Sequence, residues 1–518
     1  SGSFTTMLLA NVTIPIALLF TFSFLYRALF LLLKQRKLHH EKPPPPPGPQ
    51  PLPLIGNLHI LGKSPHRTLQ SLAKTYGPIM SLKFGQVPAI VISSSEAAQL
   101  ILKTNDIVFS IRPRTQASGI LTHGFKGVAF ADYGLYWRHV KKLITVKLLS
   151  PTKMEFFASM MREELSLVVK SFEKASSSKQ IVDLSEAVHN LMEDIAFKMN
   201  FGSHTGKDTE FNYKKLVREA MNLLGTFNVS DYLPCLRPFD LQGIKRQIKK
   251  CMKEGDEILE KMMKESEQAQ KKSKDQNHNS FIDTLVSQMN QSIGKLQDGQ
   301  ELVLDPVSVK AIISDLFSPV VEGSTIVVEW VLSELIRNQR VMKKLQHEIQ
   351  NVVGMKRMVE ETDLSELSYL DLVIKESLRL HPPGSFNPRE AREDIIMDGY
   401  YIKKKTLVLI NTWSIGRDPK AWSDDVDIFY PERFSNSEVD LKGHHFQLLP
   451  FGSGRRRCAG IRIALTLIKF VVAQFVHNFD WELPYGIKYE ELDMEEKYAF
   501  PMPRARHLLA IPSRRLPN

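Results

Sequence analysis

The chain has 518 residues, of which 43% are hydrophobic and 24% are charged, a composition that indicates a folded globular protein and not a disordered one. Its formal net charge of +11 favours an anionic partner, and since no nucleic-acid-binding motif is present we expect a membrane surface or an acidic protein rather than nucleic acid. The three cysteines, Cys235, Cys251 and Cys458, are too few for a disulfide framework, which suits a reducing compartment.

The first segment predicts a membrane anchor. Residues 7–33 are mostly apolar with Arg27 as the only charge, and about 20 apolar residues span a bilayer. Lysines and arginines follow directly, so the positive-inside rule predicts a single-pass anchor at 1–33 with the rest of the protein in the cytosol. A cleaved signal peptide is the rival interpretation, but the length of the run and the missing basic start weigh against it.

Residues 34–57 are basic and then rich in proline, with five consecutive prolines at 43–47. Such a run favours extended polyproline II and cannot be helical. We expect a stiff hinge between the anchor and a catalytic domain at 58–518. A proline-rich ligand for a small adaptor domain is the alternative.

The remainder predicts a mostly α body with a small β part. Two short β runs within 78–92 are separated by Gly85 and Gln86, which indicates a hairpin. Further strands are expected at 399–402 and 406–410. Apolar periodicity predicts helices at 94–105, 155–175, 181–200, 243–270, 304–353 and 363–380, and another after Gly460.

A loop near the C-terminus, residues 450–460, presents the single cysteine Cys458. Its glycines permit tight turns, and the three arginines before the cysteine are expected to lower the pKa of its thiol. The helical pattern after Gly460 places the cysteine just before a helix start, where an anion is favoured. A thiolate at this position acts either as a nucleophile or as an axial ligand of iron.

The spacing Phe451-x-x-Gly454-x-Arg456-x-Cys458-x-Gly460 resembles the signature of the haem-thiolate monooxygenases, the cytochrome P-450 family. A lone cysteine leaves a zinc or iron–sulfur site without enough ligands. The resemblance implies the cytochrome P-450 fold and haem b with Cys458 as the axial thiolate. It also implies dioxygen as a co-substrate, electrons from NADPH through a flavoprotein reductase, and the endoplasmic reticulum membrane.

Other motifs fit the same family. Glu376 and Arg379 lie on one helix face, and together with Arg433 they resemble the family's buried Glu–Arg–Arg network. Lys141 stands where the family has an arginine, so it would act as a point charge without a bidentate fork. The resemblance implies the following haem-binding residues besides Cys458: Arg112, Trp137, Lys141, Arg389 and Arg456.

The helix expected to activate dioxygen departs from the family pattern. Counting back from Trp330 places Glu322 at the position of the family's acid, but Gly323 at the position of its proton-relaying threonine. Two positions that are normally small hold Pro319 and Val320 instead.

These changes have physical consequences for the relay. A proline inside a helix removes a hydrogen bond, so we expect a distortion at Pro319. Such a distortion could bring Ser324 or Thr325 into the place that Gly323 leaves without a hydroxyl. The predicted catalytic residues are therefore Glu322, Ser324 and Thr325.

The resemblance also implies an apolar, aromatic-friendly substrate pocket. Its expected lining residues are Val320, Val321, Phe386, Asn387 and Phe500, with a further segment at 115–125. Short stretches at 136–138, 429–434 and 446–454 resemble plant A-type microsomal members. Those at 443–448 and 481–484 resemble a subgroup that includes biphenyl hydroxylases.

The expected function is therefore hydroxylation of a small hydrophobic, aromatic plant metabolite. Two alternatives stay open at this point. The altered helix favours an enzyme that performs oxidative coupling, ring formation or rearrangement without inserting oxygen. A noncatalytic haem protein or membrane scaffold is the other.

Overall fold

The computed structural model describes residues 42–518 except 203–205, 273–279, 296–298, 424 and 518. The predicted anchor at 1–33 and the first part of the predicted hinge, to residue 41, lie outside the described residues. The proline run that follows is non-helical, as expected. It lies against the body, because the Pro47 carbonyl accepts a hydrogen bond from the Ser81 amide at 2.8 Å and the Pro44 carbonyl accepts one from Tyr401 at 3.0 Å.

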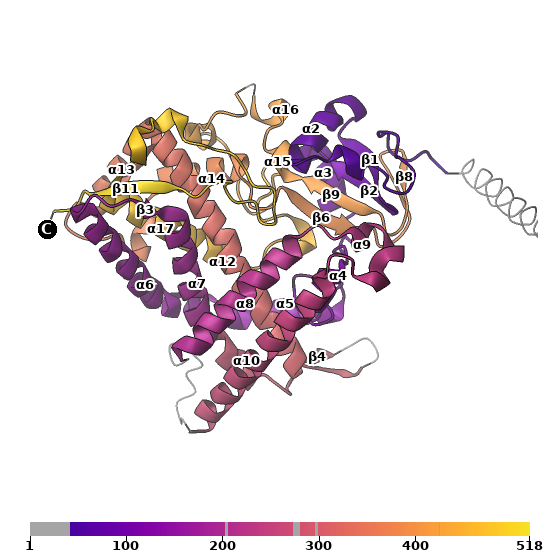
Figure 1. Cartoon of the computed structure of the whole chain (residues 1–518), viewed down its shortest axis with the longest axis horizontal. Helices are drawn as coiled ribbons and strands as arrows, with labels where there is room; N and C mark the ends of the chain where they lie inside the picture. Colours follow the sequence, from indigo (N-terminus) through magenta and orange to yellow (C-terminus); the bar gives the residue numbers. More distant parts are fainter. Residues whose placement is uncertain (1–41, 203–205, 273–279, 296–298, 424, 518) are drawn as a thin grey trace, which may run out of the picture.

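Helices make up most of the described body, in agreement with the sequence prediction (Figure 1). The α-helices are α2 (Pro65–Tyr76), α3 (Ser95–Gln99), α4 (Gln116–Leu121), α5 (Leu135–Leu143), α6 (Pro151–Ser177), α7 (Leu184–Phe201), α8 (Lys207–Gly225), α9 (Val229–Tyr232), α10 (Ile244–Lys272), α11 (Phe281–Ser287), α12 (Pro306–Arg337), α13 (Gln339–Val353), α14 (Ser368–Leu380), α15 (Thr412–Ile415), α16 (Pro419–Trp422) and α17 (Ile461–Asn478).

The strands are short and gather mainly at one end of the body, beside α2 and α3 (Figure 1). They are β1 (Ile79–Phe84), β2 (Val87–Ile92), β3 (Val182–Asp183), β4 (Ser292–Lys295), β5 (Glu301–Val303), β6 (Phe386–Glu390), β7 (Ile395–Met397), β8 (Tyr400–Ile402), β9 (Leu407–Asn411), β10 (Phe479–Glu482) and β11 (Leu509–Arg514). The largest sheet has the order β1-β2-β9-β6, in which only the β2–β9 pair is parallel. The predicted hairpin at 78–92 is confirmed as β1 and β2.

Helix α12 crosses the middle of the body and organises its core (Figure 1). Asp305 caps its start by accepting a hydrogen bond from the Ser308 amide at 2.7 Å, and Pro306 occupies the first turn, where no N–H is needed. The helix continues through Pro319, so the proline does not interrupt it. It packs on α7, α14 and α17. This packing stabilises the turn at Pro319, where proline supplies no backbone N–H.

The helical stretch expected at 304–353 consists of the two helices α12 and α13. Asn338 adopts a non-helical backbone angle, with ψ of 78°, and separates α12 from α13. Two of the described helices, α12 and α17, are long and apolar enough to cross a membrane, but 61% and 67% of their apolar windows are buried. Both therefore serve as core helices of the body.

Candidate functional site

The loop around Cys458 is held in one conformation by backbone contacts. Gly454 has a φ of +67°, and a Cβ there would lie 2.8 Å from the Asp106 carboxylate, so only glycine fits. The same carboxylate accepts hydrogen bonds from the Arg455 amide at 3.0 Å and from its guanidinium at 2.9 Å. The Cys458 amide donates to the Phe451 carbonyl at 3.0 Å. The loop thus presents the thiol immediately before α17.

The Cys458 thiol is accessible, yet protein surrounds it closely enough that burial is the largest influence on its pKa. A thiol that is accessible and yet largely surrounded by protein lines a space inside the protein. Burial raises the pKa of the thiol above its ordinary value, although Lys141, Arg112 and Arg457 act to lower it. Neighbouring positive charges therefore lower the pKa of the thiol as expected, but desolvation is the larger influence.

Two of the predicted haem-binding cations, Arg456 and Lys141, donate hydrogen bonds to backbone carbonyls and do not extend freely into that space. The Arg456 guanidinium, 4.7 Å from the centre of the Trp137 ring, donates to the Val128 carbonyl at 3.3 Å. The Trp137 indole N–H donates to the same carbonyl at 2.8 Å. Lys141 Nζ donates to the Arg455 carbonyl at 2.9 Å. These contacts tie residues 126–131, which we call the strap, to the cysteine loop.

Arg389 and Arg112 lie together, and Arg389 has unused donors. Arg389 is fully buried, and within the described residues its Nε and Nη2 have no hydrogen-bond partner. Its Nη1 and Arg112 Nη1 both donate to the Asn387 amide oxygen. Burial, and then the neighbouring charges of Arg112 and Arg456, lower the pKa of Arg389, and burial lowers the pKa of Arg112 to about 10.

Buried guanidinium donors without partners are costly, and nearby like charges add to the cost. An anionic group bound among these arginines would offset both effects. Haem b carries two carboxylates and an iron that accepts a thiolate. The residues present, Cys458 with Arg389 and Arg112, therefore fit that group.

The structure brings Glu376, Arg379 and Arg433 together behind the cysteine loop. The Glu376 carboxylate, which is fully buried, accepts two hydrogen bonds from Arg379 at 2.7 Å each and one from Arg433 Nε at 3.3 Å. Arg379 Nη1 also donates to the Gly416 carbonyl at 2.8 Å. Because every charge is paired, this network fixes α14 to the segment that leads to the cysteine loop.

The hydroxyls of Ser324 and Thr325 do not lie where Gly323 is. Successive residues of an α-helix are rotated by about 100°, so Ser324 points about 100° and Thr325 about 200° away from the Gly323 direction. Both are buried, and the Thr325 hydroxyl has no hydrogen-bond partner among the described residues. A Cβ at Gly323 would meet nothing within 4 Å, so this face of α12 opens onto unfilled space.

Glu322 is half-buried and faces a cluster of charged residues on α7 and α8. Burial raises its pKa; His189 and Arg218 act to lower it and Glu193 acts to raise it. The Glu193 carboxylate accepts two hydrogen bonds from Arg218 at 2.6 Å and contacts His189 at 3.2 Å. Sequence reasoning missed this cluster because α8 was not predicted; the i,i+4 spacing of His189 and Glu193 was the available signal.

The predicted pocket residues have different surroundings. Val321 is buried in the main apolar cluster, and Val320 packs against that cluster from a partly buried position. Phe500 is 55% exposed, and its ring lies 3.4 Å from where a Cβ at Gly384 would stand. Phe386 begins β6 and is half-buried.

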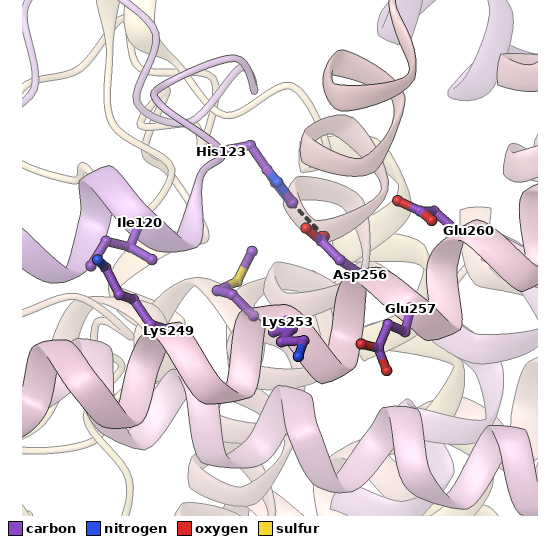
Figure 2. Close-up of a pocket in the computed structure, with 8 residues that line it drawn as sticks. Ile120, His123, Lys249, Lys253, Asp256, Glu257 and Glu260 are labelled. Atoms are coloured by element: carbon purple, nitrogen blue, oxygen red, sulfur yellow. Dashed lines mark ion pairs between the residues drawn. The ribbon is translucent and has the colours of Figure 1, made fainter.

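A separate cavity of about 450 Å³ lies between α4 and α10 (Figure 2). His123 points toward Asp256 across it, with His123 Nε2 3.7 Å from Asp256 Oδ1. Its lining is mostly charged and so does not match the apolar pocket expected from the sequence. The lining residues are Ile120, His123, Lys249, Met252, Lys253, Asp256, Glu257 and Glu260.

The sequence profile of one family, cytochrome P450, matches residues 46–509. Among curated proteins, the chain is 46% identical to cytochrome P450 CYP736A12 of Panax ginseng, over 90% of this chain and 93% of that protein. It is 40% identical to desmethyl-deoxy-podophyllotoxin synthase of Sinopodophyllum hexandrum, over 90% of this chain and 91% of that protein. It is 39% identical to melianol synthase CYP71BQ4 of Citrus sinensis, over 91% of each chain.

Proposed function

We propose a function from one premise: this chain belongs to the cytochrome P450 family, which binds haem through a cysteine thiolate and takes electrons from NADPH through a reductase. On that premise it is a plant haem-thiolate monooxygenase of specialised metabolism. It hydroxylates a small hydrophobic, aromatic compound. It is a single-pass protein of the endoplasmic reticulum membrane with its catalytic domain in the cytosol.

The observation that carries this proposal is the exposed Cys458 beside Arg112, which shares the Asn387 amide oxygen with the buried Arg389. Two donors of Arg389 have no hydrogen-bond partner among the described residues. Cys458 would hold the haem iron, while Arg389 and Arg112 would bind the haem carboxylates. Trp137, Lys141 and Arg456 would hold the strap and the cysteine loop around the group. When bound, haem supplies the redox chemistry that activates dioxygen.

The reductase would dock on the basic face beside the cysteine loop, near Arg455 and Arg457. Arg455 is exposed there and Arg457 is partly exposed, whereas Arg456 is buried, and the overall charge of the chain is positive. An acidic partner is favoured by such a surface because complementary charge steers association.

Proton transfer is assigned to Glu322 together with a water molecule beside Gly323. A carboxyl whose pKa is raised by burial keeps its proton to higher pH, which suits a proton donor. The unfilled space beside Gly323 has room for water in place of the missing hydroxyl. Ser324 and Thr325, predicted as catalytic, would take part only if α12 rotated, and its packing on α7, α14 and α17 opposes that.

Phe500 and Phe386 would supply the aromatic surface of the substrate pocket, and Val320 would line the pocket from α12. Asn387 would act chiefly by fixing Arg112 and Arg389, because its amide oxygen already accepts from both. Two of the relatives are named as synthases of melianol and of desmethyl-deoxy-podophyllotoxin, which supports a specialised metabolite as substrate. The biphenyl hydroxylase subgroup stays a prediction.

A second candidate function is oxidative coupling, ring formation or rearrangement without oxygen insertion. Gly323 favours it, because the position that normally carries the relaying hydroxyl has none. Slow proton delivery would leave time for the substrate to react without gaining oxygen.

A turnover assay separates the two candidates. The full chain in microsomes, with reductase and NADPH, is offered phenolic, biphenyl and terpenoid compounds, and product masses and peroxide are measured. A product heavier by one oxygen atom supports the monooxygenase. A product lighter by two hydrogens, or of unchanged mass, supports the second candidate. Cys458→Ala is the control and should form neither product.

A further inference from the structure

The segment at residues 496–504, which we call the C-terminal loop, is tied to the body at its start by one buried carboxylate. The Glu496 side chain is 2% exposed. Its Oε2 accepts from Arg67 Nη2 at 2.7 Å and contacts His66 Nε2 at 3.1 Å, and its Oε1 accepts from the Trp413 indole N–H at 2.9 Å. These partners lie on α2 and α15, so one side chain joins the C-terminal loop to two distant segments.

The far end of the C-terminal loop is fixed through its backbone. The Met502 carbonyl accepts from the Trp330 indole N–H at 3.2 Å, and the Met502 amide donates to the Pro383 carbonyl at 2.9 Å. Glu496 and Arg504 form an antiparallel β-bridge, so the two arms of the loop run side by side. The tip of the loop therefore lies between an ionic anchor and a backbone anchor.

Two aromatic side chains stand at this tip. Tyr498 and Phe500 are 44% and 55% exposed, yet burial raises the pKa of Tyr498 to about 12. The Tyr498 ring lies edge-on to the Phe386 ring, with 6.4 Å between the ring centres. The Phe500 ring lies 3.4 Å from where a Cβ at Gly384 would stand. Both aromatic rings therefore lie against the start of β6.

Strand β6 connects the tip of the C-terminal loop with the cysteine loop. Phe386 is followed by Asn387, whose amide oxygen accepts hydrogen bonds from Arg112 and Arg389. The Asn387 amide nitrogen would lie 3.0 Å from a Cβ at Gly452, in the cysteine loop. The tip aromatics thus border the strand that reaches the residues proposed to bind haem.

We propose that Glu496 is a positioning residue that acts through Phe500: its contacts hold the C-terminal loop so that the Phe500 ring meets an aromatic substrate. Buried charge pairs specify one geometry, because a displaced partner leaves a desolvated charge unpaired. Aromatic rings contact each other well only in offset or edge-to-face arrangements, so a shift of the loop weakens aromatic ligands most. The inference rests on the proposed function, since it takes the substrate to bind beside β6.

The test compares two ligands, imidazole and N-(biphenylmethyl)imidazole, by the shift of haem absorption when each binds to the ferric holoprotein. An imidazole nitrogen binds iron, so both ligands report on one site and only the second extends an aryl group. Wild type is expected to prefer the biphenyl compound. Phe500→Ala and Glu496→Gln should each reduce that preference by roughly 2- to 10-fold, the range for one aromatic contact.

The double variant of Glu496→Gln with Phe500→Ala separates positioning from general destabilisation. If Glu496 acts through Phe500, the double variant loses no more preference than Phe500→Ala alone, whereas independent effects would multiply. Glu495→Gln is the matched control, because it makes the same chemical change on an exposed neighbour, and it should keep the wild-type preference.

Trp413→Phe provides a milder perturbation of the same anchor. It removes one donor to Glu496 and should lower the preference in the same direction but by less. Circular dichroism and haem content verify that each variant is folded. If Glu496→Gln does not fold, Trp413→Phe alone and combined with Phe500→Ala gives the same comparison.

The proposal is overturned if the anchor variants keep the full preference for the biphenyl compound, or if their effects multiply with that of Phe500→Ala. It is also overturned if wild type shows no such preference. These measurements need no turnover, so each of these results leaves the monooxygenase proposal standing. Only the failure of imidazole itself to shift the haem absorption would contradict the proposed function as well.

Discussion

Gly323→Thr is the substitution that most directly probes the altered oxygen-activating helix. A Cβ at this position would meet nothing within 4 Å, so the new side chain begins in open space and not against a neighbour. Glycine is among the poorest residues in a helix interior and threonine is better by about 0.3 kcal/mol, so the variant should not unfold. The added hydroxyl would stand at the position that the family uses for proton relay.

The expected gain follows from one hydrogen-bonding hydroxyl. A neutral hydrogen bond is worth about 0.5–1.5 kcal/mol, which corresponds to roughly a 2- to 10-fold change in a rate. We expect the ratio of product to NADPH consumed to rise by that factor and peroxide release to fall. Both are measured in the reconstituted system with reductase.

Gly323→Val is the matched control, because valine has nearly the shape of threonine without the hydroxyl. It should leave the ratio of product to NADPH unchanged or lower it. If valine improves this ratio as much as threonine does, filling space is the cause. If neither variant changes the ratio, no hydroxyl is missing, and the reasoning on Gly323 is refuted.

Three other predictions follow from buried charges. Arg389→Met should reduce haem content per protein several-fold, measured by pyridine haemochrome, since two of its donors are proposed to bind haem carboxylates; equal haem content would contradict that role. Arg379→Ala should cost about 3–5 kcal/mol in unfolding free energy by leaving the fully buried Glu376 without its main partner; Arg379→Ala with Glu376→Gln should cost less than the sum of the single changes. Burial raises the pKa of Asp315 from 3.8 to about 6, so between these pH values the folded state holds more protons and stability falls as pH rises, by up to about 3 kcal/mol. Asp315→Asn should remove that slope in chemical denaturation from pH 4 to pH 6, and an unchanged slope would exclude Asp315 as its source.

The cysteine loop and the Glu376–Arg379–Arg433 network could be predicted because each depends on residue types at fixed spacing. Loop geometry around Cys458 follows from glycines that tolerate positive φ, and this requirement is visible in the sequence. The Glu376–Arg379 pair follows from i,i+3 spacing on a helix. Local rules were sufficient for these parts of the site.

Other features depend on how distant segments pack and could not be read from the sequence. The pKa of the Cys458 thiol is governed by desolvation, which only the folded arrangement determines. The same holds for Pro319, where tertiary packing keeps α12 continuous against the local preference of proline. The unused donors of Arg389 became evident only when its neighbours were placed.

The measurement that tests the central claim most directly is turnover under ¹⁸O₂ in ordinary water, with product mass as the readout. The account predicts that one labelled oxygen atom enters the product, that NADPH and the reductase are required, and that Cys458→Ala abolishes incorporation. A product that gains no label while NADPH is consumed would contradict oxygen insertion and would identify the altered α12 with coupling or rearrangement chemistry.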